Sequence, residues 1–258
     1  MNPSQAKILA PEFDEYGMVR EESLNRTDPW QVRLAIADTF RALAPSFTSD
    51  LLVPFFQFLI ESEALGDRNA VVRRGMLDAG AIVIDSFGQT RLSELIGVFE
   101  SYLAQPSSGT EAGDHISEAI VILFGRIASF LEASDPRVPK VVDRLVLALK
   151  TPSEVVQAAV SDCIPALVKR MRKEIEPLVA RLYAMLIDGE KYAERRGAAY
   201  GIAGVVKGRG LSSLKEFDLM DKLDAAARDK ESYTHRQGAL LAFECVSPFE
   251  RTFSRRPR

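Results

Sequence analysis

The segment ERRGAAYGIAG, residues 194–204, carries a pattern that recurs along the chain. A charged or polar residue is followed by one intervening residue, then a small residue, then apolar positions at helical spacing. The other five segments are VRLAIADTF (32–40), VRRGMLDAG (72–80), HISEAIVILFG (115–125), VQAAVSDCI (156–164) and HRQGALLAFEC (235–245). Their small residues are Ala35, Gly75, Ala119, Ala159, Gly197 and Gly238, separated by 40, 44, 40, 38 and 41 residues. Six units of nearly constant length therefore follow one another.

Each unit is predicted to form two helices, a first helix and then a second helix that carries the repeated pattern. Val156, Ala159, Val160, Cys163 and Ile164 fall at i, i+3, i+4, i+7 and i+8, which is one face of an α-helix. First helices are expected over residues 49–65, 91–104, 136–150, 172–187 and 211–228. No convincing run alternates polar and apolar residues as a half-buried strand would.

Helix pairs at a period near 40 are typical of HEAT and armadillo arrays. The predicted fold is therefore all-α, an α-solenoid (armadillo-like superhelix) of about six HEAT repeats over residues 1–247. The second helices are centred near residues 35, 75, 119, 159, 197 and 238. Residues 248–258 are expected to be a basic, disordered tail. Because this tail is too short for another helix pair, we expect the chain to be a piece of a longer solenoid.

Composition excludes several classes of protein. The 258 residues are 47% hydrophobic and 27% charged, which is close to the average of soluble globular proteins. No stretch approaches the roughly 18 apolar residues of a membrane span, and the N-terminus does not resemble a secretory signal. Cys163 and Cys245 are too few for a disulfide framework and lie inside apolar helical patterns. A reducing setting is predicted, either cytosolic (cytoplasmic) or nuclear.

Glycine is unusually frequent in the predicted second helices, which hold seven of the 16 glycines. A glycine inside a helix costs about 1 kcal/mol relative to alanine, so a compensating use is expected. We predict close helix–helix approach at Gly75, Gly80, Gly125, Gly197, Gly201, Gly204 and Gly238.

Catalytic and metal-binding motifs are missing from the sequence. It contains no HExxH, CxxC or GxSxG, and His115 and His235 each open a second helix, where capping or packing is the more common role. The glycine-rich stretch from Gly204 to Gly210 lacks Walker spacing and reads as a helix end that turns into a loop. We predict a protein that is not an enzyme and has no metal, cofactor or catalytic residue.

Charge is distributed unevenly between the two halves of the chain. Residues 1–130 hold 10 basic and 18 acidic side chains, a balance of −8, whereas residues 131–258 hold 23 and 18, a balance of +5. Two basic groups fall in turns between repeats, and such turns stack along one edge of a solenoid, about 10 Å apart. This predicted basic edge, a candidate for contact with RNA phosphates, consists of Lys169, Arg170, Arg172, Lys173, Lys207 and Arg209. The alternative is a solvated edge whose cations favour helix C-termini.

Four arginines recur at one register near the start of the second helices. For these residues a ladder of hydrogen bonds and ion pairs between repeats is favoured over ligand binding. This arginine ladder consists of Arg33, Arg73, Arg195 and Arg236.

Four segments resemble one family of proteins: DHISEAIVILFGRIA (114–128), SEVVQAAVSDCIPALV (153–168), ERRGAAYGIAGVVKGRGLSSLKEF (194–217) and RQGALLAFECVS (236–247). They resemble the giant HEAT-repeat translational activators of the general control non-derepressible protein one family. The resemblance covers roughly residues 30–247 and implies a central portion, near the part similar to the HEAT domain of fungal elongation factor three.

The resemblance implies a non-catalytic, ribosome-associated scaffold that promotes activation of the amino-acid-starvation kinase acting on an initiation factor. It also implies an ABC-type ATPase partner, which binds the elongation-factor-like region. In this family the kinase-binding segment lies further downstream, so the kinase is expected to be reached through other parts of the full-length protein.

Two functions of other classes remain open from the residues alone, because solenoids serve many partners. One is a HEAT-repeat transport receptor or phosphatase-type scaffold that grips a peptide or a small GTPase in its groove. The other is an ATP-dependent enzyme, which would have to turn over nucleotide.

Overall fold

The computed structural model describes residue 18 and residues 28–105, 109–132, 135–169, 171 and 174–253, with side chains as far as residue 247. Most of these residues are helical, and none of them is in a strand. The α-helices are α3 (Trp30–Leu43), α4 (Leu52–Glu61), α5 (Ala70–Phe87), α6 (Leu92–Leu103), α7 (Glu111–Ala128), α8 (Val138–Ala148), α9 (Glu154–Val168), α10 (Ile175–Asp188), α11 (Tyr192–Arg209), α12 (Ser212–Glu216), α13 (Leu219–Ala227) and α14 (Tyr233–Phe253). Short 3-10 turns occur at η1 (Ala44–Ser46), η2 (Ala64–Gly66) and η3 (Gly88–Arg91). The prediction of an all-α solenoid is confirmed.

The repeated small residues fall in α3, α5, α7, α9, α11 and α14, and the first helices are α4, α6, α8, α10 and the pair α12–α13. One predicted helix, over residues 211–228, is wrong as a single element. The backbone of Asp218 is left-handed, with φ of 53°, and this residue separates α12 from α13. A left-handed residue cannot continue a right-handed helix, so the chain turns there.

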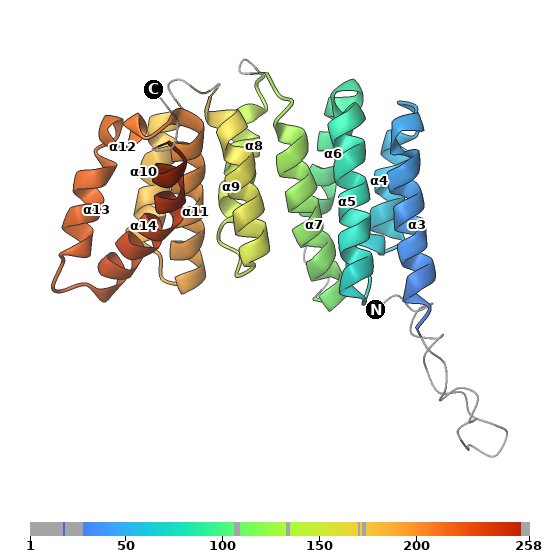
Figure 1. Cartoon of the computed structure of the whole chain (residues 1–258), viewed down its shortest axis with the longest axis horizontal. Helices are drawn as coiled ribbons and strands as arrows, with labels where there is room; N and C mark the ends of the chain where they lie inside the picture. The colour runs from blue at the N-terminus through green and yellow to red at the C-terminus, as the bar shows by residue number, and fades with distance from the viewer. Residues whose placement is uncertain are drawn as a thin grey trace. The chain divides into compact units, whose positions relative to one another are not determined.

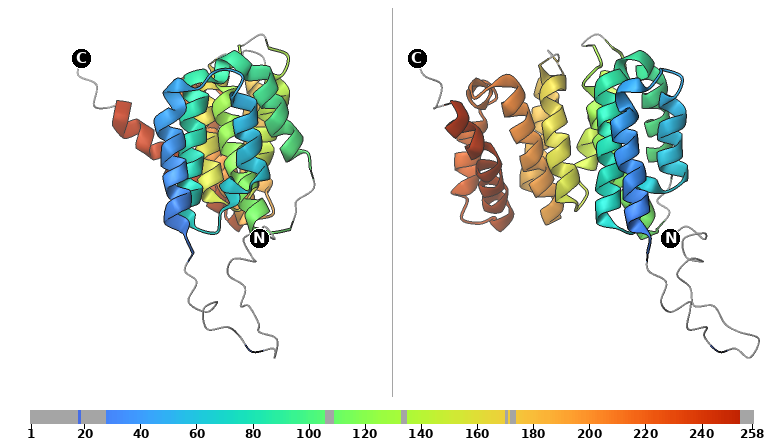
Figure 2. Two further views of the ribbon diagram at one scale, coloured as in Figure 1. Left: turned by 90° about the vertical axis from the view of Figure 1, so that its right-hand side faces the viewer. Right: turned by 45° about the vertical axis from the view of Figure 1, so that its right-hand side comes forward.

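The chain divides into two compact units, a first unit of Met1–Leu123 and a second unit of Phe124–Arg258. In the first unit α3 and α5 pack side by side, and α4 and α6 form the layer behind them (Figures 1 and 2). Four edge-to-face ring contacts organise its core: Phe55 meets Phe40, Phe47 and Phe56 at centroid distances of 5.1–5.2 Å, and Phe56 meets Phe99 at 5.3 Å. The last contact joins α4 to α6 through two fully buried rings.

In the second unit the helices α9, α11 and α14 pack in sequence, with α10 and α13 against them (Figure 1). The glycines of α11 explain how closely these helices approach. A Cβ at Gly204 would lie 2.8 Å from the carbonyl oxygen of Ser161 in α9, and one at Gly201 would lie 2.7 Å from Leu182 in α10. The prediction that these glycines permit close helix–helix approach is confirmed.

The C-terminal helix α14 extends to Phe253 and so enters the segment that was predicted as a basic tail. Residues 254–258 lie outside the described residues. None of the helices that the structure describes combines the length and apolar character needed to cross a bilayer.

Candidate nucleic-acid interface

Three of the six residues of the predicted basic edge can be placed in the structure. Lys169 follows the last residue of α9, and Lys207 and Arg209 are in the last turn of α11. All three are exposed. Arg170, Arg172 and Lys173 lie outside the described residues.

The C-terminal ends of α9 and α11 are in direct contact, which brings these basic residues to one end of the helix pair. A Cβ at Gly208 would overlap Val168 and lie 2.9 Å from the Cα of Pro165. Helix α11 ends at Arg209 because Gly210 has a φ of 90°, a left-handed conformation that favours glycine. The glycine-rich stretch is therefore a helix end that turns into a loop, as the sequence predicted.

Two of the three cations already have carboxylate partners. Lys207 Nζ lies 2.6 Å from Asp162 Oδ1 of α9, and Arg209 lies 3.0 Å from Glu216 Oε1 of α12. Such exposed pairs contribute about 0–1 kcal/mol each, so a phosphate could replace the carboxylate at little cost. Because Asp162 and Glu216 neutralise part of this charge, the local excess of positive charge is smaller than the number of basic residues in the sequence suggests.

The arginine ladder occupies the opposite end of the second helices. The predicted bonds between repeats are confirmed for Arg33, which reaches Asp67, and for Arg195, which reaches Gln237, whereas the hydrogen bonds of Arg73 and Arg236 stay within their own repeat. Arg195 donates to Gly189 O at 2.6 Å and to Gln237 Oε1 at 2.6 Å, and only 6% of the residue is exposed. Arg236 donates to Asp229 O at 2.6 Å, and Arg73 donates to Asp67 O at 2.7 Å. Each of these guanidinium groups satisfies carbonyls of the turn that precedes its own helix.

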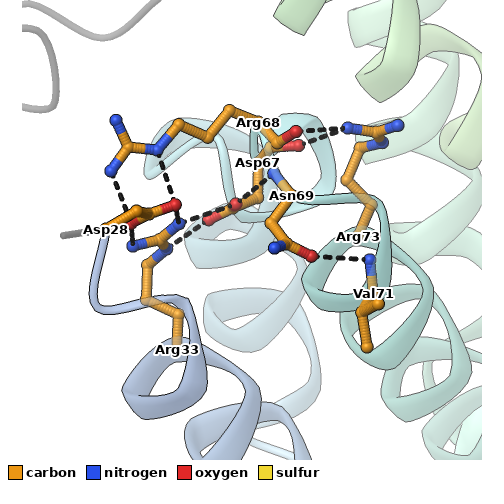
Figure 3. A network of polar contacts seen from close by, with 7 residues as sticks. All are labelled: Asp28, Arg33, Asp67, Arg68, Asn69, Val71 and Arg73. Carbon is orange, nitrogen blue, oxygen red and sulfur yellow. Dashed lines mark hydrogen bonds and ion pairs between the residues drawn. The ribbon is translucent and has the colours of Figure 1, made fainter.

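In the first unit the ladder begins with a cluster of two acids and two arginines (Figure 3). Arg33 donates to both Asp28 and Asp67 at 2.5–3.0 Å, and Arg68 donates to Asp28 at 2.5–2.9 Å. Hydrogen bonds from Arg33 and then Arg68 hold the pKa of Asp28 well below its ordinary value of 3.8. The four side chains pair with one another, and one guanidinium nitrogen, Arg68 Nη1, is buried without a hydrogen-bond partner among the described residues.

Gln157 is the residue that sequence reasoning missed. It is fully buried in α9, and its Nε2 lies 2.7–2.9 Å from the carbonyl oxygens of Leu149, Thr151 and Ala193. Its Oε1 accepts from Arg196 Nε at 2.8 Å, which links α9 to α11. The available signal was its register, because Gln157 stands two residues before the small residue, where other repeats have arginine.

The remaining reactive side chains take structural roles. His235 Nδ1 lies 2.7 Å from Asp229 Oδ2, in the turn that starts α14. Burial raises the pKa of the Cys163 thiol to about 12 and that of Cys245 to about 11. Among the side chains that the structure describes, no three His, Cys, Asp or Glu residues are grouped as metal ligands.

Comparisons with known proteins show which sequences this chain is similar to. The family model described as stalled ribosome sensor GCN1, HEAT repeats, matches residues 3–129. The chain is 38% identical over 236 residues to the human stalled ribosome sensor GCN1, which covers 92% of this chain and 9% of that protein. It is 44% identical over 217 residues to protein ILITYHIA of Arabidopsis thaliana, covering 84% of this chain and 8% of the relative. It is 36% identical over 246 residues to the eIF-2-alpha kinase activator GCN1 of Saccharomyces cerevisiae, and this match covers 94% of the chain and 9% of the yeast protein. The chain thus spans less than a tenth of the length of these relatives, and no solved structure matches it.

Proposed function

The chain belongs to the GCN1 family of HEAT-repeat proteins, and from this we propose that it is a non-catalytic scaffold segment of a translational regulator. The regulator associates with ribosomes and promotes activation of an eIF-2-alpha kinase. The observation that carries the proposal is the identity of 36–44% over more than four fifths of the chain to relatives that include a ribosome sensor and a kinase activator. Stacked helix pairs suit this role because they offer extended surfaces on a rigid core.

The partners follow from the same proposal. The chain contacts ribosomal RNA phosphates through the basic edge. Its residues Lys169, Lys207 and Arg209 are exposed where the C-terminal ends of α9 and α11 touch. The starvation-responsive kinase is reached through other parts of the full-length protein, and an ABC-type ATPase binds the elongation-factor-like region. The protein acts in the cytoplasm.

Sedimentation of the purified chain with ribosomes over a salt series tests the ribosome contact. We expect pelleting that weakens as salt rises, because phosphate contacts release counterions. The variant Lys169→Glu/Lys207→Glu/Arg209→Glu should lose most of this pelleting, and adding the reversals Arg170→Glu, Arg172→Glu and Lys173→Glu should abolish it.

A matched control reverses three exposed basic residues at the other end of the helices, Lys191→Glu/Arg228→Glu/Lys230→Glu. Lys191 precedes the 18-residue helix α11 and Arg209 is its last residue, so the two ends are about 27 Å apart. The control variant should pellet like the parent. Equal loss in both variants would mean nonspecific attraction, and full pelleting of the six-residue variant at low salt would contradict the basic edge.

The pair between Lys207 and Asp162 provides a variant with the opposite effect. Asp162→Asn removes the carboxylate that competes for Lys207 Nζ, so ribosome pelleting should persist to higher salt. Weaker pelleting of Asp162→Asn would contradict a phosphate contact at Lys207.

A further inference from the structure

A groove runs between the first helices α4 and α6 of the first unit. It encloses about 620 Å³, which is in the usual range for ligand pockets. Its lining comes from one face of each helix: Val53, Gln57, Ile60 and Glu61 of α4, and Glu94, Gly97, Val98, Ser101 and Tyr102 of α6, with Gln105 beyond. The apolar members are half-buried and form the floor, whereas the glutamine and glutamate side chains are exposed at the rims.

Gly97 lies at this groove and differs from the other glycines of the long helices. A Cβ added at Gly97 would meet no atom within 4 Å, whereas one at Gly80, Gly125 or Gly204 would meet a neighbouring helix at 2.6–3.3 Å. Glycine inside a helix costs about 1 kcal/mol, and no packing within the described residues offsets that cost at Gly97. The space above its backbone is therefore open to solvent and accessible to an atom from outside the unit.

The corresponding junctions of the second unit are bridged by side chains. Arg181 of α10 pairs with Asp143 of α8. Tyr183 of α10 donates to the carbonyl of Lys222 in α13 at 3.2 Å, and Lys222 Nζ lies 6.0 Å from the centre of the Tyr183 ring. Among the described side chains no hydrogen bond or ion pair joins α4 to α6. Glu94 instead pairs with Arg91, the last residue of η3, at 2.7 Å.

Charge at the rims selects the kind of occupant. Glu61 and Glu94 are exposed on opposite helices, and Glu61 takes part in no ion pair among the residues described. Carboxylates on both rims repel the phosphates of RNA and attract lysine or arginine. The half-buried floor of Val53, Ile60 and Val98 favours an apolar group between the cations, because covering it removes apolar surface from water.

We propose that the groove between α4 and α6 is a docking site for a peptide segment of a partner protein. The segment inserts a large apolar side chain over Gly97 and places lysine or arginine side chains beside Glu61 and Glu94. Short apolar anchors flanked by charges are a common way for peptides to bind helical grooves. The site is separate from the basic edge, which belongs to the other unit of the chain.

Selection of short random peptides displayed on phage against the whole 258-residue chain tests the proposal. Enriched peptides should carry a leucine, isoleucine, methionine or phenylalanine flanked by lysine or arginine. Their affinity, measured by fluorescence anisotropy, should fall at least about tenfold in Gly97→Leu, which fills the space above the backbone, and similarly in Glu61→Lys/Glu94→Lys.

The control variant Glu176→Lys/Asp221→Lys changes two exposed acids of the second unit and should bind the peptides like the parent. Gly97→Ala separates folding from binding, because it should raise the melting temperature of the chain whatever it does to peptide affinity.

Three outcomes would overturn the proposal: no enrichment of any peptide, enriched peptides without lysine or arginine, or unchanged peptide affinity in Gly97→Leu. Concentration-dependent self-association that Gly97→Leu abolishes would also overturn it, since a second copy would then be the occupant. Ribosome pelleting should be the same in Gly97→Leu and the parent, so this proposal and the basic edge fail independently.

Discussion

Gly197 of α11 lies directly against the carbonyl oxygen of Leu149, which caps the end of α8, and a Cβ at residue 197 would overlap that oxygen. The same contact recurs one repeat later, where a Cβ at Gly238 of α14 would overlap the carbonyl oxygen of Leu186. In these two repeats the small residue is thus the point where a second helix touches the end of the preceding repeat's first helix, whereas Gly75 lies against Leu34 and Ala37 of the second helix α3.

The first prediction follows from that contact. Gly197→Ala should lower the free energy of unfolding by about 3 kcal/mol, the upper part of the range for overpacking, because backbone rather than a flexible side chain must move. Urea denaturation followed by circular dichroism measures the change. Gly97→Ala is the matched control and should raise the free energy of unfolding by up to about 1 kcal/mol. Similar values for the two variants would contradict the contact.

Gln157 is predicted to be the most sensitive polar side chain of the second unit. Gln157→Leu leaves the carbonyls of Leu149 and Ala193, and the guanidinium of Arg196, without their shared partner. An unsatisfied buried polar group costs about 1–3 kcal/mol, so we expect a loss of at least about 2 kcal/mol in urea denaturation. Gln57→Leu, at an exposed position of α4, should change stability by less than about 0.5 kcal/mol. A neutral Gln157→Leu would mean that water replaces the amide.

Asp28 is predicted to make stability depend on pH in the acid range. Its pKa is depressed by hydrogen bonds from Arg33 and Arg68, so the unfolded chain takes up the proton first as pH falls. The stabilisation is therefore present above the ordinary pKa of 3.8 and is lost as pH falls from there toward the lower folded value. Asp28→Asn should cost about 1 kcal/mol at pH 7 and show a smaller loss of stability between pH 4 and pH 2 than the parent.

Thermal unfolding over a pH series measures this effect. Asp38→Asn removes an exposed carboxylate that pairs with Arg41 and, within the described part of the chain, with no other cation, so this variant should keep the parent's pH profile. A parallel decline of Asp28→Asn and the parent below pH 4 would show that Asp28 does not control it.

The two thiols are predicted to react slowly in the folded chain. With a pKa of about 11, Cys245 holds about a hundredfold less thiolate at pH 8 than a thiol of pKa 9.0, and Cys163, at about 12, holds less still. Alkylation by iodoacetamide should modify Cys245 before Cys163, and urea should bring both to the rate of a model peptide. Peptide mapping by mass spectrometry measures the order. Fast alkylation of Cys163 without urea would mean that α9 opens locally.

The repeated pattern was sufficient to predict the class of fold, the approximate first and second helices and the role of the glycines. Apolar spacing along ERRGAAYGIAG or VQAAVSDCI is a local property, and a helix forms from contacts a few residues apart. The interruption at Asp218 escaped this reasoning because an aspartate in a polar stretch does not distinguish a helix interior from a left-handed turn.

Tertiary structure alone decided which polar groups meet. Lys207 and Asp162 are 45 residues apart in the chain, and Arg196 and Gln157 are 39 apart, so only the stacking of α11 on α9 brings them together. Of the three basic-edge residues that the structure describes, Lys207 and Arg209 form ion pairs with carboxylates of other helices. The open groove at Gly97 is likewise a property of two helices together. Periodicity fixes what each helix must bury, whereas charge pairing and open space depend on how neighbouring helices are set against one another.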